Sequence, residues 1–305
     1  MTSAPQTPTG SPVAFSNPVS APVPLDAQQR LAQAVATDVD RALAEDVGAG
    51  DLTAALVPST PARARVLARE SAVVCGAPWV EAAFARVVPG GQLVWKVAEG
   101  QRAAPDQVVL EMTGPAPALL TAERTMLNFL QLLSGVATRT AQFVDAVAGT
   151  RARIVDTRKT LPGLRVAQKY AVTVGGGANH RMGLYDAILI KENHIAAASG
   201  VSAVLQKAQQ SAPQAQFVQI EVERLDQLAE ALAGGATMVL LDNMDLPTLR
   251  EAVRLNAGRA VLEVSGGVTL DTVHALAETG VDRISIGGLT KDVKATDYSM
   301  RFEGI

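Results

Sequence analysis

The stretch Ala187-Ile-Leu-Ile-Lys-Glu-Asn193 joins four apolar residues directly to a charged segment. A short apolar run of this kind is typical of a buried strand, and the charged residues stand where the strand would end. The same pattern recurs through the second half of the chain. Further strand-like runs lie at Ile154–Val155, Phe217–Ile220, Met238–Leu241, Ala260–Leu262 and Arg283–Ile286.

Nearly every gap between these runs can hold an amphipathic helix. Alternating strands and helices predict a parallel sheet with right-handed crossovers, either closed as a barrel or open and doubly wound. Polar or glycine residues follow every run, which suits the loops of a barrel, whereas an open sheet would concentrate them at one switch point. The pattern therefore predicts an incomplete α/β barrel with fewer than eight strands.

The strand ends supply the candidate functional residues. In chain order these are Thr157-Arg158-Lys159, Lys191-Glu192-Asn193, Glu221 with Glu223, Asp242-Asn243, Ser265-Gly266-Gly267 and Gly287-Gly288. The two glycine clusters follow the last two strands, where small residues let backbone N–H groups approach phosphate oxygens closely. They predict a phosphate site, with tight turns alone as the alternative.

Basic residues gather in the segment 158–191. It holds three of the seven lysines of the chain together with three arginines and one histidine: Arg158, Lys159, Arg165, Lys169, His180, Arg181 and Lys191. Convergent cations predict a polyanionic ligand. Those that directly follow strands are expected at the mouth of the barrel. Arg165 and Lys169, on the helix between, are instead expected on a solvated basic face.

Two further features of the mouth leave alternatives open. His180 lies in a glycine-rich loop beside Arg181, which favours anion recognition over a purely structural histidine. Glu221 and Asp242 come from adjacent strands, and carboxylates beside phosphates hold Mg²⁺ or sugar hydroxyls. The alternative for both carboxylates is a salt bridge to a neighbouring cation.

The rest of the chain divides into a tail and a smaller domain. Residues 1–25 hold six of the sixteen prolines and no charged residue, so we expect a disordered tail. Residues 26–127 begin with a helix and continue as short β-type runs divided by Pro and Gly, which predicts a compact α+β domain. Residues 289–305 are expected to return to it, and 128–288 to form the barrel.

Composition excludes several classes of function. The net charge of −3 lacks the basic excess that binding to nucleic acid or to an anionic membrane surface requires. No apolar run is long enough to span a bilayer. The single Cys75 excludes an internal disulfide framework and points to a reducing compartment, and the tail carries no basic targeting stretch, so the cytoplasm is expected.

Three long motifs closely resemble the quinolinate phosphoribosyltransferases, also called carboxylating nicotinate-nucleotide pyrophosphorylases. They are Asp156-Thr-Arg-Lys-Thr-Leu-Pro-Gly163, Gly175-Gly-Gly-Ala-Asn-His-Arg-Met-Gly-Leu-Tyr-Asp186 and Leu189-Ile-Lys-Glu-Asn-His194. Shorter matches extend over nearly all of the chain after the tail, at Glu45-Asp46, Gly50–Thr53, Glu123-Arg124, Asn128-Phe129, Glu221–Glu223, Leu241–Asn243, Ser265–Gly267 and Ile286–Gly288.

The resemblance implies a reaction and an assembly. In this family quinolinate and phosphoribosyl pyrophosphate, with Mg²⁺, give nicotinate mononucleotide, pyrophosphate and carbon dioxide for NAD synthesis. The resemblance also implies that residues 26–127 form an N-terminal α/β sandwich beside an incomplete α/β barrel, and that the protein is a homodimer whose site borrows residues across the interface.

Carried over to this sequence, the family pattern implies a role for each motif residue. Arg124 from the partner subunit, with Arg158, His180, Arg181 and Lys191, would surround the carboxylates of quinolinate. Lys159 and Lys191 would also face the phosphates, and Glu221 and Asp242 would contact ribose hydroxyls or Mg²⁺. The loops Ser265–Gly267 and Gly287–Gly288 would hold the 5′-phosphate, beside Thr157.

Two other functions are compatible with a barrel of this kind, and each predicts a change among the motif residues. A related barrel with a different acceptor should lose part of the dicarboxylate pocket, whereas Arg124, Arg158, His180, Arg181 and Lys191 are all present. A catalytically silent, phosphosugar-binding barrel should have a broken metal or leaving-group site, whereas Lys159, Glu221 and Asp242 are present. The enzyme is therefore the favoured interpretation, with Lys159, Lys191, Glu221 and Asp242 as its catalytic residues.

Overall fold

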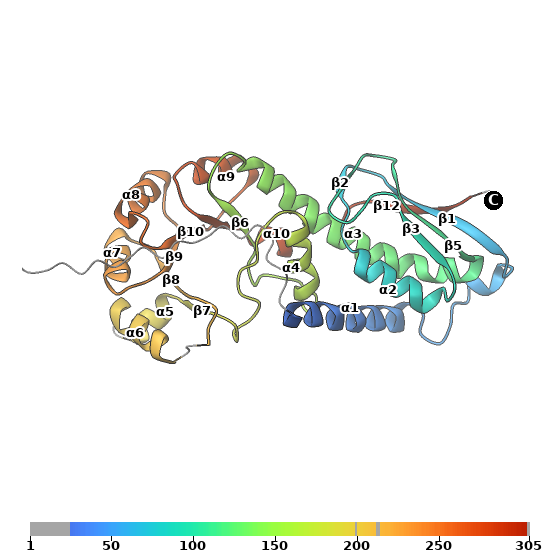
Figure 1. Cartoon of the computed structure of the whole chain (residues 1–305), viewed down its shortest axis with the longest axis horizontal. Helices are drawn as coiled ribbons and strands as arrows, with labels where there is room; N and C mark the ends of the chain where they lie inside the picture. The colour runs from blue at the N-terminus through green and yellow to red at the C-terminus, as the bar shows by residue number, and fades with distance from the viewer. Residues whose placement is uncertain (1–24, 199, 212–213, 304–305) are drawn as a thin grey trace, which may run out of the picture.

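The computed structural model describes residues 25–198, 200–211 and 214–303. The predicted tail, apart from Leu25, lies outside the described residues. The first helix, α1 (Leu25–Asp46), begins one residue before residue 26, where the sequence predicts the start of the N-terminal domain. In Figure 1 it runs along one side of the molecule beneath α2 and α4. Its Val39 is fully buried, so α1 closes the side of the core it covers.

The N-terminal domain is an antiparallel sheet backed by helices. Its elements are η1 (Ala54–Leu56), β1 (Pro61–Ala68), β2 (Ala72–Val73), α2 (Ala77–Val87), β3 (Gln92–Trp95), β4 (Arg102–Ala103) and β5 (Val108–Pro115). The main sheet has the order β12-β1-β5-β3, where β12 (Tyr298–Phe302) is the final strand of the chain. The α/β sandwich predicted from the sequence is confirmed, and the return of the chain to it takes the form of β12 pairing with β1.

One long helix, α3 (Ala116–Ala146), connects the two parts of the molecule. Figure 1 shows it running from the barrel into the sandwich, where it packs beside α2. At Gly135 the returning chain passes so close that a Cβ would clash with the Lys294 carbonyl, which explains glycine in mid-helix. The boundary predicted at 127/128 falls inside α3.

The barrel contains every strand that the sequence predicts. Its strands are β6 (Arg153–Val155), β7 (Ile188–Ile190), β8 (Val218–Val222), β9 (Met238–Asp242), β10 (Val261–Ser265) and β11 (Arg283–Ser285). Its helices are α4 (Arg165–Val174), α5 (Glu192–Ala197), α6 (Val201–Ser211), α7 (Leu225–Ala233), α8 (Leu246–Asn256), α9 (Leu270–Ala277) and α10 (Gly288–Lys291).

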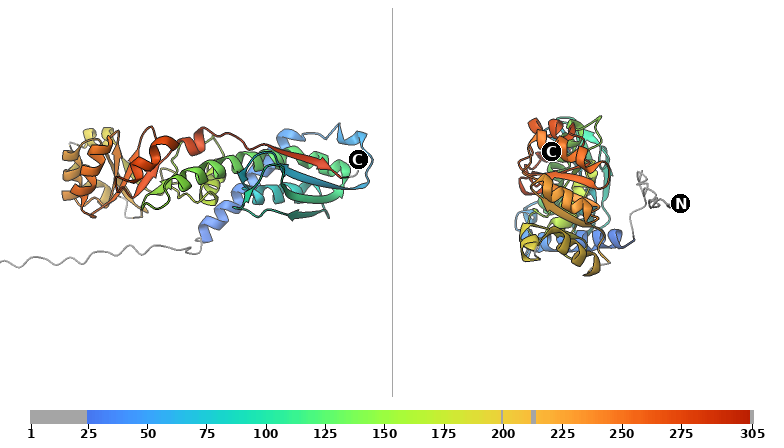
Figure 2. Two further views of the ribbon diagram at one scale, coloured as in Figure 1. Left: turned by 90° about the horizontal axis from the view of Figure 1, so that it is seen from above. Right: turned by 90° about the vertical axis from the view of Figure 1, so that its left-hand side faces the viewer.

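The strand order is β6-β11-β10-β9-β8-β7, with every pair parallel. The first strand therefore pairs with the last, as it does in a barrel, while β6 and β7 are the two edges of the sheet in the part of the chain that the structure describes. The prediction of an incomplete α/β barrel is confirmed. The two views in Figure 2 show an elongated molecule with the barrel at one end and the sandwich at the other.

Within the described ranges, no helix combines the length and the apolar character needed to cross a membrane.

Candidate active site

A cavity of about 740 Å³ opens at the carboxyl ends of the barrel strands. Residues from all six strand ends line it, because parallel strands of a barrel deliver their following loops to one face. Among the predicted site residues, those that line it are Thr157, Arg158, Lys159, His180, Arg181, Lys191, Glu221, Asp242, Ser265, Gly266, Gly267, Gly287 and Gly288. Arg124 lies elsewhere, on an exposed face of α3.

We call Thr157, Lys159, Lys191, Glu221 and Asp242 the rim of this cavity. Lys191 follows β7, and its Nζ lies 3.3 Å from Glu221 Oε2 at the end of β8. The Lys191 side chain is half exposed. The salt bridge considered for Glu221 is thus present, but it stands at the open mouth, where a ligand could replace one partner.

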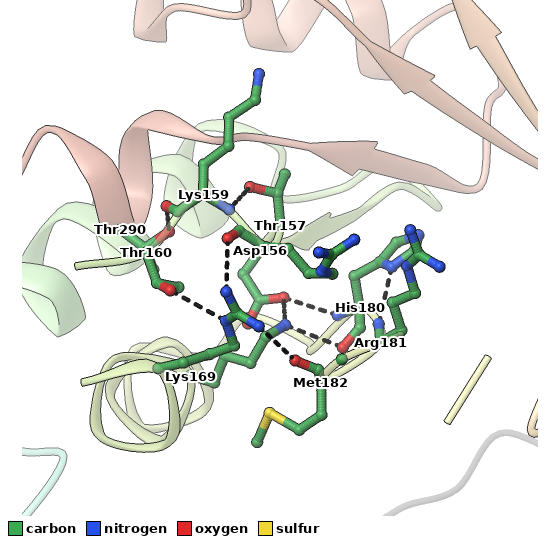
Figure 3. Close-up of polar contacts among 12 residues, drawn as sticks. Asp156, Thr157, Lys159, Thr160, Lys169, His180, Arg181, Met182 and Thr290 are labelled. Atoms are coloured by element: carbon green, nitrogen blue, oxygen red, sulfur yellow. Dashed lines mark hydrogen bonds and ion pairs between the residues drawn. The ribbon is translucent and has the colours of Figure 1, made fainter. Parts of the chain in front are cut away.

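The other rim residues are held by local contacts that leave their charges facing the cavity. The main-chain N–H of Lys159 donates to Thr157 Oγ1 at 3.1 Å, and its carbonyl accepts from Thr290 Oγ1 at 2.7 Å. Figure 3 shows the Lys159 side chain extending away from these contacts. Asp242 accepts a hydrogen bond from the Asn243 side chain at 3.1 Å.

The two glycine loops bring backbone close to the rim. Gly266 and Gly267 have φ values of 106° and 58°, which favour glycine over residues with a Cβ. A Cβ at Gly287 would lie 3.0 Å from Lys159 Cδ. These loops therefore keep the space above the ends of β10 and β11 free of side chains, as a bound phosphate would need.

A second polar cluster, which we call the floor, consists of His180 and Glu263, which line the cavity, and their partners Gln219 and Arg283. Gln219 and Glu263 are fully buried. The ring nitrogen Nε2 of His180 lies 2.7 Å from Gln219 Oε1 and 3.8 Å from Glu263 Oε1, and Arg283 Nε donates to Glu263 Oε2 at 2.9 Å. Sequence reasoning missed Glu263 and Arg283, although a single charge inside the apolar run Val261–Val264 is a signal that could have found Glu263.

The state of His180 follows from its partners. Its Nδ1 accepts a hydrogen bond from the Arg181 main-chain N–H at 2.8 Å, so the hydrogen-bond pattern assigns the ring proton to Nε2. Burial lowers the pKa of His180, and it outweighs the nearby Glu263 and Gln219, which raise that pKa. At neutral pH the cavity therefore presents a neutral imidazole and a cationic Arg181.

The prediction that Lys169 and Arg165 lie on a solvated face is wrong. Lys169 is fully buried, and its ammonium forms an ion pair with Asp156, which is also fully buried (Figure 3). Arg165 is partly buried and donates to Thr160 Oγ1 at 3.1 Å and to the Met182 carbonyl at 3.1 Å. The physical reason is that both side chains find acceptors in neighbouring loops, and these interactions offset the desolvation of the buried charge.

The cavity can hold a divalent metal through two carboxylates. Glu221 and Asp242 lie on adjacent strands, and both line it. Within residues 25–198, 200–211 and 214–303, no three or more His, Cys, Asp or Glu side chains form a metal-binding group. Mg²⁺ commonly binds through one or two carboxylates and completes its shell with water and substrate phosphates, so the residues present fit that mode.

Comparisons with known proteins place this geometry in context. Residues 51–134 match the N-terminal domain model of quinolinate phosphoribosyl transferase, and residues 136–301 match the C-terminal domain model. A nicotinate-nucleotide pyrophosphorylase (carboxylating) of Mycobacterium leprae is 42% identical over 270 residues, covering 86% of this chain and 95% of that protein.

Two further relatives agree with this match. A probable nicotinate-nucleotide pyrophosphorylase (carboxylating) of Bacillus subtilis is 40% identical over 257 residues, covering 84% of this chain and 89% of that protein. The solved nicotinate-nucleotide pyrophosphorylase of Francisella tularensis superposes with a TM-score of 0.87 at 40% identity, covering 89% of this chain and 97% of that one.

Proposed function

Because the chain belongs to the quinolinate phosphoribosyltransferase family, we propose that its barrel cavity is where quinolinate and phosphoribosyl pyrophosphate react. The chain is a pentosyltransferase that gives nicotinate mononucleotide, pyrophosphate and carbon dioxide in NAD biosynthesis. The observation that carries the assignment of the site is the meeting of basic side chains and carboxylates in one cavity. Among its lining residues, those to which the proposal gives a role are the basic Arg158, Lys159, His180, Arg181 and Lys191 and the acidic Glu221 and Asp242.

The basic residues suit a dicarboxylate beside a polyphosphate. Arg158, Arg181 and Lys191 can pair with the two carboxylates of quinolinate. The Nε2–H of His180 contacts Gln219 Oε1, and a quinolinate carboxylate can accept from it in addition to or in place of Gln219. Lys159 stands beside the Gly287 loop and can meet phosphate oxygens. The two substrates would thus lie next to each other, as an attack on the ribose requires.

The carboxylates suit the sugar and the metal. Glu221 and Asp242 would contact the ribose hydroxyls or hold Mg²⁺, which when bound would neutralise part of the pyrophosphate charge. The loops Ser265–Gly267 and Gly287–Gly288 would bind the 5′-phosphate through backbone N–H groups. Each of these roles falls on residues that line the cavity.

The chemistry needs positioning and electrostatics more than proton transfer. As pyrophosphate leaves, positive charge develops on the ribose ring, and nearby carboxylates stabilise it while Lys159 and Lys191 stabilise the leaving group. The pyridine nitrogen, once bonded to ribose, is cationic and stabilises the carbanion that forms when the adjacent carboxylate departs as carbon dioxide, and this carbanion then takes a proton from water to give the product. No residue has to act as a general base.

We propose a homodimer in which Arg124 completes the quinolinate site of the partner subunit. Arg124 is exposed on α3 and lies outside its own chain's cavity, so it is available to a neighbouring subunit. Mixing Arg124→Ala and Lys191→Ala proteins should restore activity through hybrid dimers that contain one intact site. If subunits exchange and no activity returns, the shared site is contradicted.

The unpaired, buried Cys75 supports a reducing compartment, and we propose the cytoplasm as the location.

The decisive experiment follows carbon dioxide release from carboxyl-labelled quinolinate. Purified protein should release it only when phosphoribosyl pyrophosphate and Mg²⁺ are both present, and Lys159→Ala should abolish release. Nicotinate, which lacks the second carboxylate, should yield no pyrophosphate. Turnover of nicotinate at a comparable rate would contradict the assigned specificity.

A further inference from the structure

The buried ion pair between Asp156 and Lys169 holds both main-chain groups of one residue of the floor. Asp156 Oδ1 accepts from the His180 main-chain N–H at 2.8 Å, and Lys169 Nζ donates to the His180 carbonyl at 3.0 Å. Neither charged group lines the cavity, whereas His180 and its neighbour Arg181 do. Figure 3 shows both members of the pair beside the His180 main chain, with hydrogen bonds to it. The contact is therefore a clamp on the backbone.

The clamp fixes more than one side chain. The His180 imidazole accepts from the Arg181 N–H, so its orientation follows from the main chain at 180–181. Asp156 also follows β6 directly and precedes the rim residue Thr157. Its main-chain N–H donates to the Ala178 carbonyl at 3.1 Å, so the loop that carries His180 is tied to the segment after β6 that carries Arg158.

Asn179 completes the arrangement around Asp156. With its amide group turned so that the NH₂ faces oxygens, Asn179 donates to Asp156 Oδ2 at 2.6 Å and to the Lys169 carbonyl at 3.0 Å. Asp156 thus receives donors from α4 and from two consecutive residues of the loop. The Asp156 carboxylate therefore fixes the position of the 179–180 loop relative to α4.

A purely stabilising role does not require charge at this place. Burial raises the pKa of Asp156 to about 6 and lowers the pKa of Lys169, which shows that desolvation opposes the charged forms. Apolar residues of similar volume often stabilise a core as well as a buried ion pair does, whereas only polar groups can hold a backbone N–H and C=O at once.

We propose that Asp156 and Lys169 are positioning residues for the quinolinate subsite: they set His180 and Arg181 against the dicarboxylate without touching substrate. The inference rests on the proposed function. Because the clamp acts on the 180–181 segment, its loss should weaken quinolinate recognition and spare the recognition of phosphoribosyl pyrophosphate by the glycine loops.

The test compares Asp156→Asn, Lys169→Met and the double variant, with Lys207→Met on exposed α6 as the matched control. Each single variant leaves one buried charge without its partner and should lower Tm. The double variant removes both charges, so its Tm should return most of the way to the wild-type value. Its KM for quinolinate should nevertheless stay about tenfold above the wild-type value, while the KM for phosphoribosyl pyrophosphate stays within about twofold.

Two outcomes would overturn the proposal. A double variant with a wild-type quinolinate KM would show a pair that only stabilises the fold, and an equal rise in both KM values would show general disorder of the site. If the double variant does not fold, Asn179→Ala, which removes a donor to Asp156 without stranding a charge, should raise the quinolinate KM about threefold. An unchanged KM in that folded variant would contradict the proposal.

Equilibrium binding of quinolinate, measured by calorimetry on the same proteins, separates this inference from the proposed function. Wild-type protein that binds quinolinate without turning it over would contradict the function, and the clamp would still be judged by the loss of affinity in the variants. Wild-type protein that neither binds nor turns over quinolinate would overturn both.

Discussion

The rim and the floor of the cavity are both rich in charge, but they use it differently. Rim charges such as Lys191 and Asp242 stand at the open mouth, and their local contacts leave them able to meet a ligand. The floor charges Glu263 and Arg283 are engaged with one another below the mouth. The rim thus presents its charges to substrates, whereas Glu263 and Arg283 pair with each other inside the protein beside His180.

Because of this difference, substitutions at the rim and at the floor should affect different properties of the protein. Removing an exposed cation takes away an interaction with a ligand and leaves folding nearly unchanged. Removing one member of a buried pair leaves the other without compensation and destabilises the fold. Substitutions at the two levels should therefore fall into different classes, one seen in kinetics and the other in unfolding.

The largest expected effect is at the rim. Lys191→Ala should lower kcat/KM by about a thousandfold, equivalent to about 4 kcal/mol, because it removes a cation shared by quinolinate and the phosphates. Its Tm should stay within about 2 °C of the wild type. Lys207→Ala on α6 is the control. A rim variant that keeps more than a tenth of the activity would break the comparison.

The next effect is at the floor. Arg283→Met strips the fully buried Glu263 of its ion-pair partner and should lower the free energy of unfolding at pH 7 by about 3 kcal/mol. Arg254→Met, which removes an exposed partner of Glu251, should lower it by less than about 1 kcal/mol. Urea unfolding measures both. Equal losses would show that the floor pair is no more demanding than a surface pair.

A smaller effect concerns a close approach at the rim. Gly287→Ala places a Cβ 3.0 Å from Lys159 Cδ and should displace that side chain by a few tenths of an ångström. The KM for phosphoribosyl pyrophosphate should rise about fivefold, with little change for quinolinate. Gly234→Ala, at the end of α7 outside the cavity lining, is the matched control. A selective rise in the quinolinate KM would reverse the assignment of this loop.

The smallest effect is the pH dependence of stability through His180. Because burial lowers its pKa, the folded protein binds this proton less readily than the unfolded chain, whose histidine titrates near about 6.5. The unfolded state therefore gains stability from this group as pH falls below that value. On going from pH 7.5 to pH 5.5, the Tm of the wild type should fall by about one or two degrees more than the Tm of His180→Gln. A difference that does not vary with pH would contradict the lowered pKa.

The rim could be predicted from sequence because it follows strands. The apolar runs are followed closely by residues that line the cavity, and Lys191 and Asp242 are each the first residue after an apolar run. The barrel was predictable for the same reason, since its strands and polar ends alternate regularly along the chain.

The floor depends on pairs that are distant in sequence. Glu263 and Arg283 lie on neighbouring strands and are 20 positions apart. Lys169 was expected in solvent because nothing along α4 shows that Asp156, 13 positions earlier, is its counterion. Whether a charged side chain is buried or solvated depends on whether the fold brings it a partner. A single sequence does not show which distant residues become partners.

The return of the chain through β12 also affects how the protein is made. The β12 strand pairs with β1, yet all six barrel strands are translated between them. During synthesis on the ribosome, one edge of β1 stays unpaired until the barrel strands and then β12 have been translated. The N-terminal domain is therefore completed last. Long-range pairing of this kind slows folding and leaves a strand edge exposed to other nascent chains, which makes β1 the segment that a chaperone would have most reason to protect.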